Sequence, residues 1–319
     1  MRFHNPIMVE NQAKQPVKSP ENLVFSGGGI KGLAYAGAIC ALEEKGLFKA
    51  VKRMAGASAG AITASLLAIG MNGSEIKNEM KKVDFATFLQ KSNVNIQEIA
   101  DNPKKILDPI IGFKVIYDEA EHKGLCDASV FTQWLTSMFK KKGFDEKTTF
   151  LKLNIETNKE LSIAICNINY GKTIIANYTN TPDMPVVAAV RASMSMPFIF
   201  QPFLWKGDLY VDGGTMYNYP IEVFDEECPP EKTLGFILSK EDSVLNPKRK
   251  ADDGIVEHIE CFFDAVMNVS YEYCFRLGNQ YRTVFIDPAG VGTLDFKLTD
   301  EQKNNLVNNG HAATLDYFK

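Results

Sequence analysis

Histidine, excess positive charge and long apolar runs are all scarce in this sequence. The 319 residues include only four histidines, and 35 basic against 39 acidic side chains give a net charge of −4. A chain without a basic excess lacks the electrostatic footprint of a nucleic-acid-binding protein. The longest uncharged stretch, residues 54–74, is rich in Ala, Gly and Ser, which makes it too small and polar for a transmembrane helix despite its length. Any membrane contact is therefore expected to be peripheral.

Cysteine supplies no metal motif, although an even count of six is also compatible with disulfides. The six cysteines are scattered, with no CxxC pair and no metal-ligand spacing to the histidines, so we expect reduced thiols and no bound metal or cofactor. The first 22 residues contain no apolar run of the kind found in a secretory signal. These features together predict a cytoplasmic protein that associates only transiently with membranes.

The composition is that of an ordinary globular protein, with 45% apolar and 23% charged residues. We expect a loose leader over residues 1–20 and a single domain over 21–319. The predicted strands are 22–26, 51–57, 150–155, 161–168, 209–211, 234–238 and 283–286, with 150–155 and 161–168 paired as a hairpin. The predicted helices are 33–45, 59–69, most of 74–142, 185–195, 255–277 and 299–318. This alternation favours an α/β domain with a largely parallel sheet.

A glycine-rich loop, Gly27-Gly28-Gly29-Ile30-Lys31-Gly32, stands between the first predicted strand and helix. Its backbone N–H groups suit either a dinucleotide pyrophosphate or the oxyanion of an ester-hydrolysis intermediate, and a tight packing turn is the third alternative. A dinucleotide site also needs an acidic residue at the end of the second strand. That strand ends in Gly56-Ala57-Ser58 instead, which argues against a nucleotide.

The residues at that strand end read Gly56-Ala57-Ser58-Ala59-Gly60, a G-x-S-x-G pattern between a strand and a helix. Small residues permit the sharp turn of a nucleophile elbow, which exposes a serine hydroxyl. The pattern alone is weak, because helices often begin with Gly, Ala and Ser. The strand–turn–helix context and the neighbouring glycine loop make Ser58 a candidate nucleophile.

A third motif, Asp212-Gly213-Gly214, would in isolation indicate only a turn. It is preceded by AVRASMSMPF at 189–198 and followed by NYP at 218–220. Together with GGGIKG at 27–32 and GASAG at 56–60, these segments resemble the patatin-like phospholipase family in order and spacing. The resemblance runs from about residue 21 to the C-terminal helix.

The resemblance implies a three-layer α/β/α sandwich and an esterase with a Ser–Asp dyad. It implies that Ser58 is the nucleophile and Asp212 the base. The oxyanion hole would comprise the backbone N–H groups of Gly27, Gly28 and Gly29, helped by that of Ala59. Lys31, the one charge in the glycine loop, either contacts a lipid phosphate or points to solvent.

The expected activity is that of a lipid acyl hydrolase of the phospholipase A or lysophospholipase type. Its substrate would be a phospholipid or lysophospholipid at a membrane or micelle surface, and a protein activator remains open. The alternatives are a neutral-lipid esterase or acyltransferase with the same dyad, and a non-catalytic lipid-binding module on the same fold.

Two histidines bear on the identity of the base. Ser58, Asp212 and either His258 or His311 follow the chain order of a Ser–Asp–His triad. Both histidines fall within predicted helices, however, and neither stands at a strand end near a loop motif. We therefore expect both to be ordinary packing or surface residues. The apolar residues of 85–113 and 194–203 predict either core packing or an acyl-chain channel with a lid.

Overall fold

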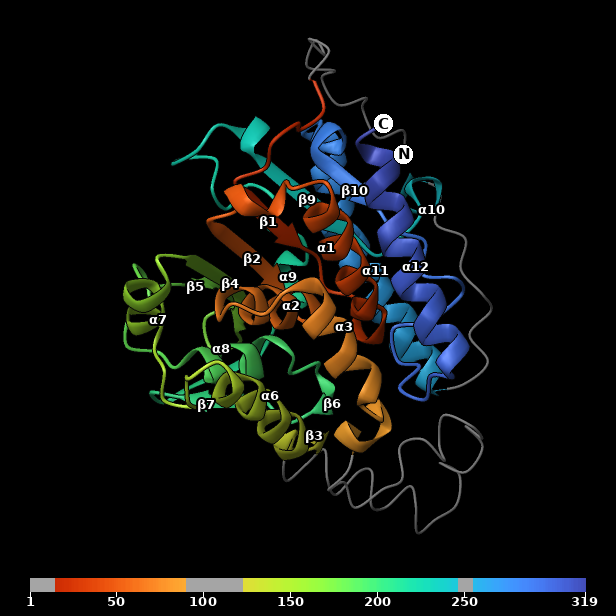
Figure 1. Ribbon diagram of the computed structural model, residues 1–319. Helices are drawn as coiled ribbons and strands as arrows, with labels where there is room; N and C mark the ends of the chain where they lie inside the picture. The colour runs from red at the N-terminus through yellow and green to blue at the C-terminus, as the bar shows by residue number, and fades with distance from the viewer. Residues whose placement is uncertain (1–14, 90–122, 246–254) are drawn as a thin grey trace.

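The computed structural model describes residues 15–89, 123–245 and 255–319 (Figure 1). The first part of the expected leader and most of the expected lid segment lie outside these ranges. Within the leader's described part, Val17 is buried, and its N–H donates a hydrogen bond of 2.8 Å to the hydroxyl of Tyr317. The chain just before the first strand is thus packed against the C-terminal helix.

A mixed sheet of mostly parallel strands forms the centre of the molecule. Its strand order is β10-β9-β1-β2-β4-β8-β7, and β5 pairs with β4 off this path. The strands from β10 to β4 are parallel, whereas β5 and β8 run antiparallel to β4. The bounds are β1 Asn22–Phe25, β2 Arg53–Ala57, β4 Glu160–Asn167, β5 Lys172–Ala176, β7 Phe203–Trp205, β8 Asp208–Asp212, β9 Thr233–Ile237 and β10 Thr283–Phe285. A second, two-stranded sheet pairs β3 (Gly124–Cys126) with β6 (Phe198–Phe200).

Helices cover both faces of the large sheet, which gives the expected α/β/α sandwich. In Figure 1, α1 and α2 lie in front of β1 and β2, and α12 packs along α1. On the opposite face lie α9 and α11, which contact each other. The helix bounds are α1 Ala34–Glu44, α2 Ala59–Ala68, α3 Gly73–Lys82, α6 Ser129–Lys141, α7 Phe150–Thr157, α8 Val186–Ser193, α9 Gly214–Tyr217, α10 Glu241–Leu245, α11 Ile255–Arg276 and α12 Asp300–Tyr317.

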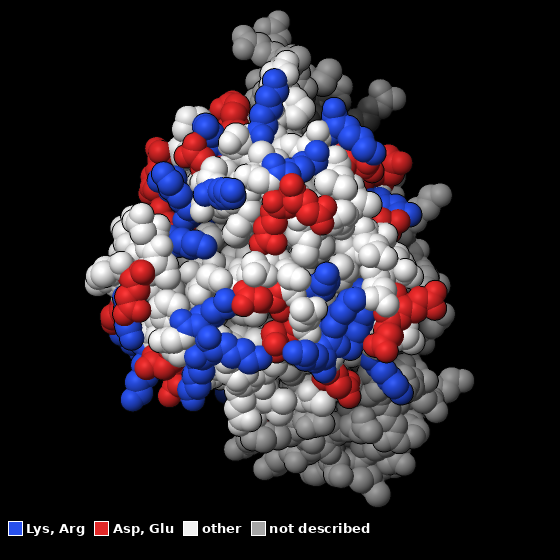
Figure 2. Space-filling view, in the orientation of Figure 1, with Lys and Arg blue, Asp and Glu red and all other residues white. Residues whose placement is uncertain are grey.

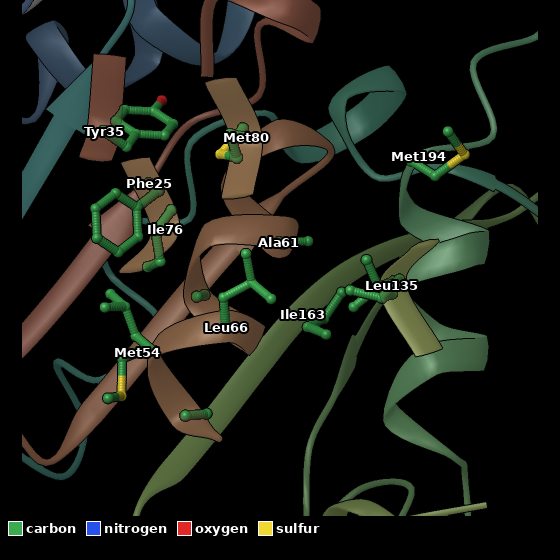
Figure 3. Close-up of a cluster of buried hydrophobic side chains, with 14 of the residues drawn as sticks. Phe25, Tyr35, Met54, Ala61, Leu66, Ile76, Met80, Leu135, Ile163 and Met194 are labelled. Carbon is green, nitrogen blue, oxygen red and sulfur yellow. The ribbon is translucent and has the colours of Figure 1, made fainter. Parts of the chain in front are cut away.

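The central strands are buried on both faces, as the short apolar runs of the sequence predict. Successive side chains of a strand point to opposite faces. Accordingly, Leu23 and Phe25 of β1 belong to the larger hydrophobic cluster, beside α1 and α2, whereas Val24 belongs to the smaller one, with Tyr271 of α11. Figure 3 shows the larger cluster, in which Phe25 lies close to Tyr35 of α1. This packing anchors the strand ends from which the candidate site is built.

The predicted hairpin of residues 150–155 and 161–168 is wrong. Residues 150–157 form helix α7, and the antiparallel hairpin partner of β4 is β5. Thr149 caps the helix start by accepting a hydrogen bond from the Lys152 N–H, and Asn158 ends it in a left-handed conformation. Phe150 and Leu153 are buried and three residues apart, as on one face of a helix. The caps and this spacing favour a helix more strongly than the residue composition favours a strand.

Candidate active site

Ser58 occupies a sharp turn between β2 and α2, as the G-x-S-x-G pattern predicts. Its backbone has φ 51° and ψ −120°, a conformation that costs a non-glycine residue about 1–3 kcal/mol. The flanking glycines are needed because the backbones pass so closely. A Cβ on Gly60 would lie 2.1 Å from the carbonyl oxygen of Phe25, and one on Gly56 would lie 2.3 Å from the carbonyl carbon of Gly60. The Ser58 hydroxyl makes no capping bond to α2.

Asp212 ends β8 and lies beside Ser58 because both strands are aligned on β4. Ala57 pairs with Ala164 of β4, and the next residue, Ile165, pairs with Asp212. Two side chains far apart in the sequence are thereby brought to one edge of the sheet. Asp212 is 4% exposed, and its carboxyl group accepts a hydrogen bond of 2.7 Å from the Gly214 N–H.

Burial dominates the acidity of this carboxyl group. It raises the pKa of Asp212 from its usual 3.8 to about 7, against the opposing effect of hydrogen bonds from the Ser58 side chain and the Gly214 N–H. A carboxylate with a pKa near neutrality is a far better proton acceptor than an ordinary aspartate, and about half of such groups are ionised at pH 7. The Ser58 side chain and this buried carboxyl group therefore lie together at one edge of the sheet.

Two of the four histidines, His258 and His311, lie within the described residues. His311 contacts Glu44 at 2.9 Å on the side of α1 and α12, and His258 is exposed on α11. Among the described residues no hydrogen bond joins a histidine to Ser58 or Asp212. The other two histidines, His4 and His122, fall outside the described ranges. The part of the chain that the structure describes also contains no cluster of three or more His, Cys, Asp or Glu side chains suited to a metal ion.

The glycine loop abuts the elbow, but its three N–H groups are not equivalent. The Gly27 N–H already donates a hydrogen bond of 3.1 Å to the carbonyl of Asn218, which removes it from the expected set of oxyanion donors. The backbone N–H groups of Gly28 and Gly29 donate no such hydrogen bond within the described residues. Gly29 also requires its hydrogen side chain: its φ is 59°, and a Cβ would lie 2.1 Å from the Thr293 carbonyl oxygen. A third donor is the Ala59 N–H, which opens α2 and has no partner within that helix.

A buried network of hydroxyl groups supports the loop from behind. The Tyr271 hydroxyl of α11 contacts the Ser26 hydroxyl at 3.1 Å and donates to the Gly27 carbonyl at 3.3 Å. It also accepts a hydrogen bond of 3.0 Å from the side-chain amide of Asn218. The role of Asn218 was not recognised from the sequence, where NYP served only as part of a family resemblance.

An apolar cavity of about 60 Å³ opens beside Ser58. Its walls come from the elbow, from α3, from the segment Phe85–Leu89 and from the AVRASMSMPF segment. Its apolar lining side chains include Ile62, Met80, Phe85, Phe88, Met194 and Met196. Such a lining suits a hydrocarbon chain. Lys31 of the glycine loop is half-buried, with its Cε near Gly28.

Known proteins resemble this chain over most of its length. It is 28% identical to the uncharacterized protein R571 of Acanthamoeba polyphaga mimivirus over 95% of each chain, and 30% identical to the uncharacterized protein YqhO of Bacillus subtilis over 93% of this chain and 97% of that one. A probable lipid hydrolase, 463L of Invertebrate iridescent virus 6, is 27% identical over 64% of this chain and 62% of its own.

A solved structure shares the fold. VipD from Legionella pneumophila superimposes with a TM-score of 0.60 at 21% identity, over 98% of this chain and 72% of that one. The family model for patatin-like phospholipases matches residues 23–225, a range that contains the glycine loop, the Ser58 elbow and Asp212. The chain thus belongs to the patatin-like phospholipase family.

Proposed function

We propose that this protein hydrolyses a carboxylic ester of a phospholipid or lysophospholipid, with Ser58 as nucleophile and Asp212 as base. Membership of a family of lipid ester hydrolases supports the reaction class. The observation that carries the residue assignment is the placement of Ser58 beside the buried carboxyl group of Asp212, where β2 and β8 meet adjacent residues of β4.

The reaction begins when the ester carbonyl lies over Ser58. Asp212 accepts the hydroxyl proton as the Ser58 oxygen attacks the carbonyl carbon. The resulting oxyanion is stabilised by the N–H groups of Gly28, Gly29 and Ala59. Preorganised donors of this kind are worth roughly 2.7–4 kcal/mol each. The tetrahedral intermediate collapses to an acyl-enzyme, and the alcohol product leaves with the proton from Asp212. Water, deprotonated by the same carboxylate, then attacks the acyl carbon. The bond to the Ser58 oxygen breaks, the proton passes from Asp212 to that oxygen, and the fatty acid leaves.

The surroundings of the pair support a lipid substrate. The apolar lining of the cavity beside Ser58 suits the start of an acyl chain, and Lys31 of the glycine loop is the candidate contact for the phosphate. None of the described helices is long and apolar enough to cross a bilayer. On the face seen in Figure 2, basic and acidic side chains are interspersed, so that face offers no continuous basic surface to anionic lipids.

The deciding experiment compares wild type with Ser58→Ala and the nearby control Ser65→Ala. Ser65 is also buried, but its hydroxyl donates its hydrogen bond to the Ile62 carbonyl of its own helix. Fatty acid release from phospholipid, lysophospholipid and triacylglycerol should fall to background in Ser58→Ala alone. A folded Ser58→Ala variant with wild-type rates refutes the assignment. Appearance of the acyl group on an added alcohol in place of water identifies an acyltransferase.

A further inference from the structure

The AVRASMSMPF segment has no part in the proposed chemistry, yet the end of its helix contacts both reactive residues. The backbone N–H of Ser58 donates a hydrogen bond of 2.9 Å to the hydroxyl oxygen of Ser193, the last residue of α8. Two residues later, the carbonyl of Ser195 accepts a hydrogen bond of 2.9 Å from the Asp212 N–H. One helix end therefore fixes the backbone of the nucleophile and that of the base.

The Ser193 hydroxyl differs from the other buried serine hydroxyls nearby. Serines in helices commonly bond to a carbonyl one turn back, and Ser195 does so with Arg191, and Ser65 with Ile62. The Ser193 hydroxyl instead donates to the Ala164 carbonyl of β4 at 2.7 Å. Its single proton is used there, so its oxygen is left to accept from Ser58.

The position of this contact matters because Ser58 holds an unfavourable backbone conformation. A residue with a φ of 51° and no glycine side chain keeps that geometry only when its surroundings fix it. Ser193 is fully buried and Ser58 is 7% exposed, so water is not available to replace the hydroxyl. Ala164, the acceptor of Ser193, also pairs with Ala57, directly before the nucleophile.

We propose that Ser193 is a positioning residue for the nucleophile: its hydroxyl ties the Ser58 N–H to the β4 carbonyl of Ala164 and so holds the elbow in its reactive conformation. The inference rests on the proposed function, since it requires Ser58 to be the nucleophile. Ser193 itself touches neither substrate nor the transferred proton. Its loss should slow attack by Ser58 and leave substrate binding unchanged.

The test measures the reaction of the full chain with an alkyl fluorophosphonate, which labels an activated serine. Three variants are compared with wild type: Ser193→Ala, Ser193→Thr, and the matched control Ser65→Ala. For Ser193→Ala we expect the second-order labelling rate and the kcat for lysophospholipid to fall on the order of 100-fold, the loss that a misplacement of about 1 Å produces. The final labelling stoichiometry and KM should stay at their wild-type values. Ser193→Thr, which keeps the hydroxyl, should retain the wild-type rate.

The final labelling stoichiometry separates a misplaced Ser58 from a misfolded protein. If Ser193 only stabilised the fold, Ser193→Ala would lower the number of molecules that are labelled but not the labelling rate of each folded molecule. Equal labelling rates in Ser193→Ala and Ser65→Ala overturn the inference. If Ser193→Ala does not fold, Ser193→Cys, whose sulfur is a weak acceptor, is used for the same comparison with the same criterion. Mass spectrometry of labelled wild type distinguishes the two failures: label on a residue other than Ser58 refutes the proposed function, and this inference with it.

Discussion

Replacing Asp212 by asparagine should abolish turnover and, at the same time, make the fold less sensitive to alkaline pH. The asparagine is nearly isosteric but is unable to accept the Ser58 proton. Burial raises the pKa of Asp212 from 3.8 to about 7, so between these values the native state holds a proton that the unfolded chain has released. Stability therefore falls as the pH rises through this window, and the loss is complete above pH 7.

The magnitude follows from the two pKa values. Their difference corresponds to about 4 kcal/mol over the whole range, and to roughly 2–3 kcal/mol between pH 5 and pH 8. Asp212 is almost fully buried, so solvent screening reduces this figure little. The Asp212→Asn variant has no carboxyl group at this position, so this proton is neither bound nor released. From pH 5 to pH 8, the wild type should therefore lose roughly 2–3 kcal/mol more unfolding free energy than Asp212→Asn does.

The assay is urea unfolding of wild type and Asp212→Asn at pH 5 and pH 8, together with kcat on one phospholipid. A suitable control is Asp208→Asn, which removes a carboxyl group from the same strand at a partly exposed position. The control should follow the wild-type pH dependence. Parallel stability curves for wild type and Asp212→Asn would show that the carboxyl group is not held protonated by burial, and measurable turnover in Asp212→Asn would exclude it as the base.

The remaining predictions concern the base, the elbow and the cavity. In wild type, kcat/KM should rise with pH through one ionisation near pH 7, since Asp212 must be ionised to accept a proton; a flat profile from pH 5 to pH 8 contradicts this. His258→Ala and His311→Ala should each keep most of the activity on one phospholipid, and a folded variant as inactive as Asp212→Asn would restore a Ser–Asp–His triad. Gly60→Ala should lower the free energy of unfolding by about 1–3 kcal/mol or more, seen as a lower Tm, because its Cβ meets a backbone carbonyl. Met194→Trp should raise KM for long-chain esters and leave short-chain esters unaffected, because the indole would fill the apolar cavity; equal effects on both would place the acyl chain elsewhere.

The sequence alone predicted those strands and helices whose own residues show a clear apolar run or helical spacing. The buried strand before the glycine loop, the elbow helix and the long helices α11 and α12 all appear close to their predicted bounds. Small residues on both sides of Ser58 also predicted the sharp turn, because no larger side chain fits where the backbones of β1 and α2 pass so closely. The α/β class followed from the alternation of these elements.

Tertiary structure decided which strands are neighbours, and therefore what surrounds each reactive group. The sequence does not reveal that Ala57 and Asp212 meet adjacent residues of β4, which is what brings Ser58 and Asp212 together. Nor does it reveal that the Gly27 N–H is already paired with Asn218, or that the Ser58 N–H is held by Ser193. The pKa of Asp212 is likewise a property of burial. These features depend on contacts between residues far apart in the chain, whereas a motif read along the chain records only the residue types that such contacts require.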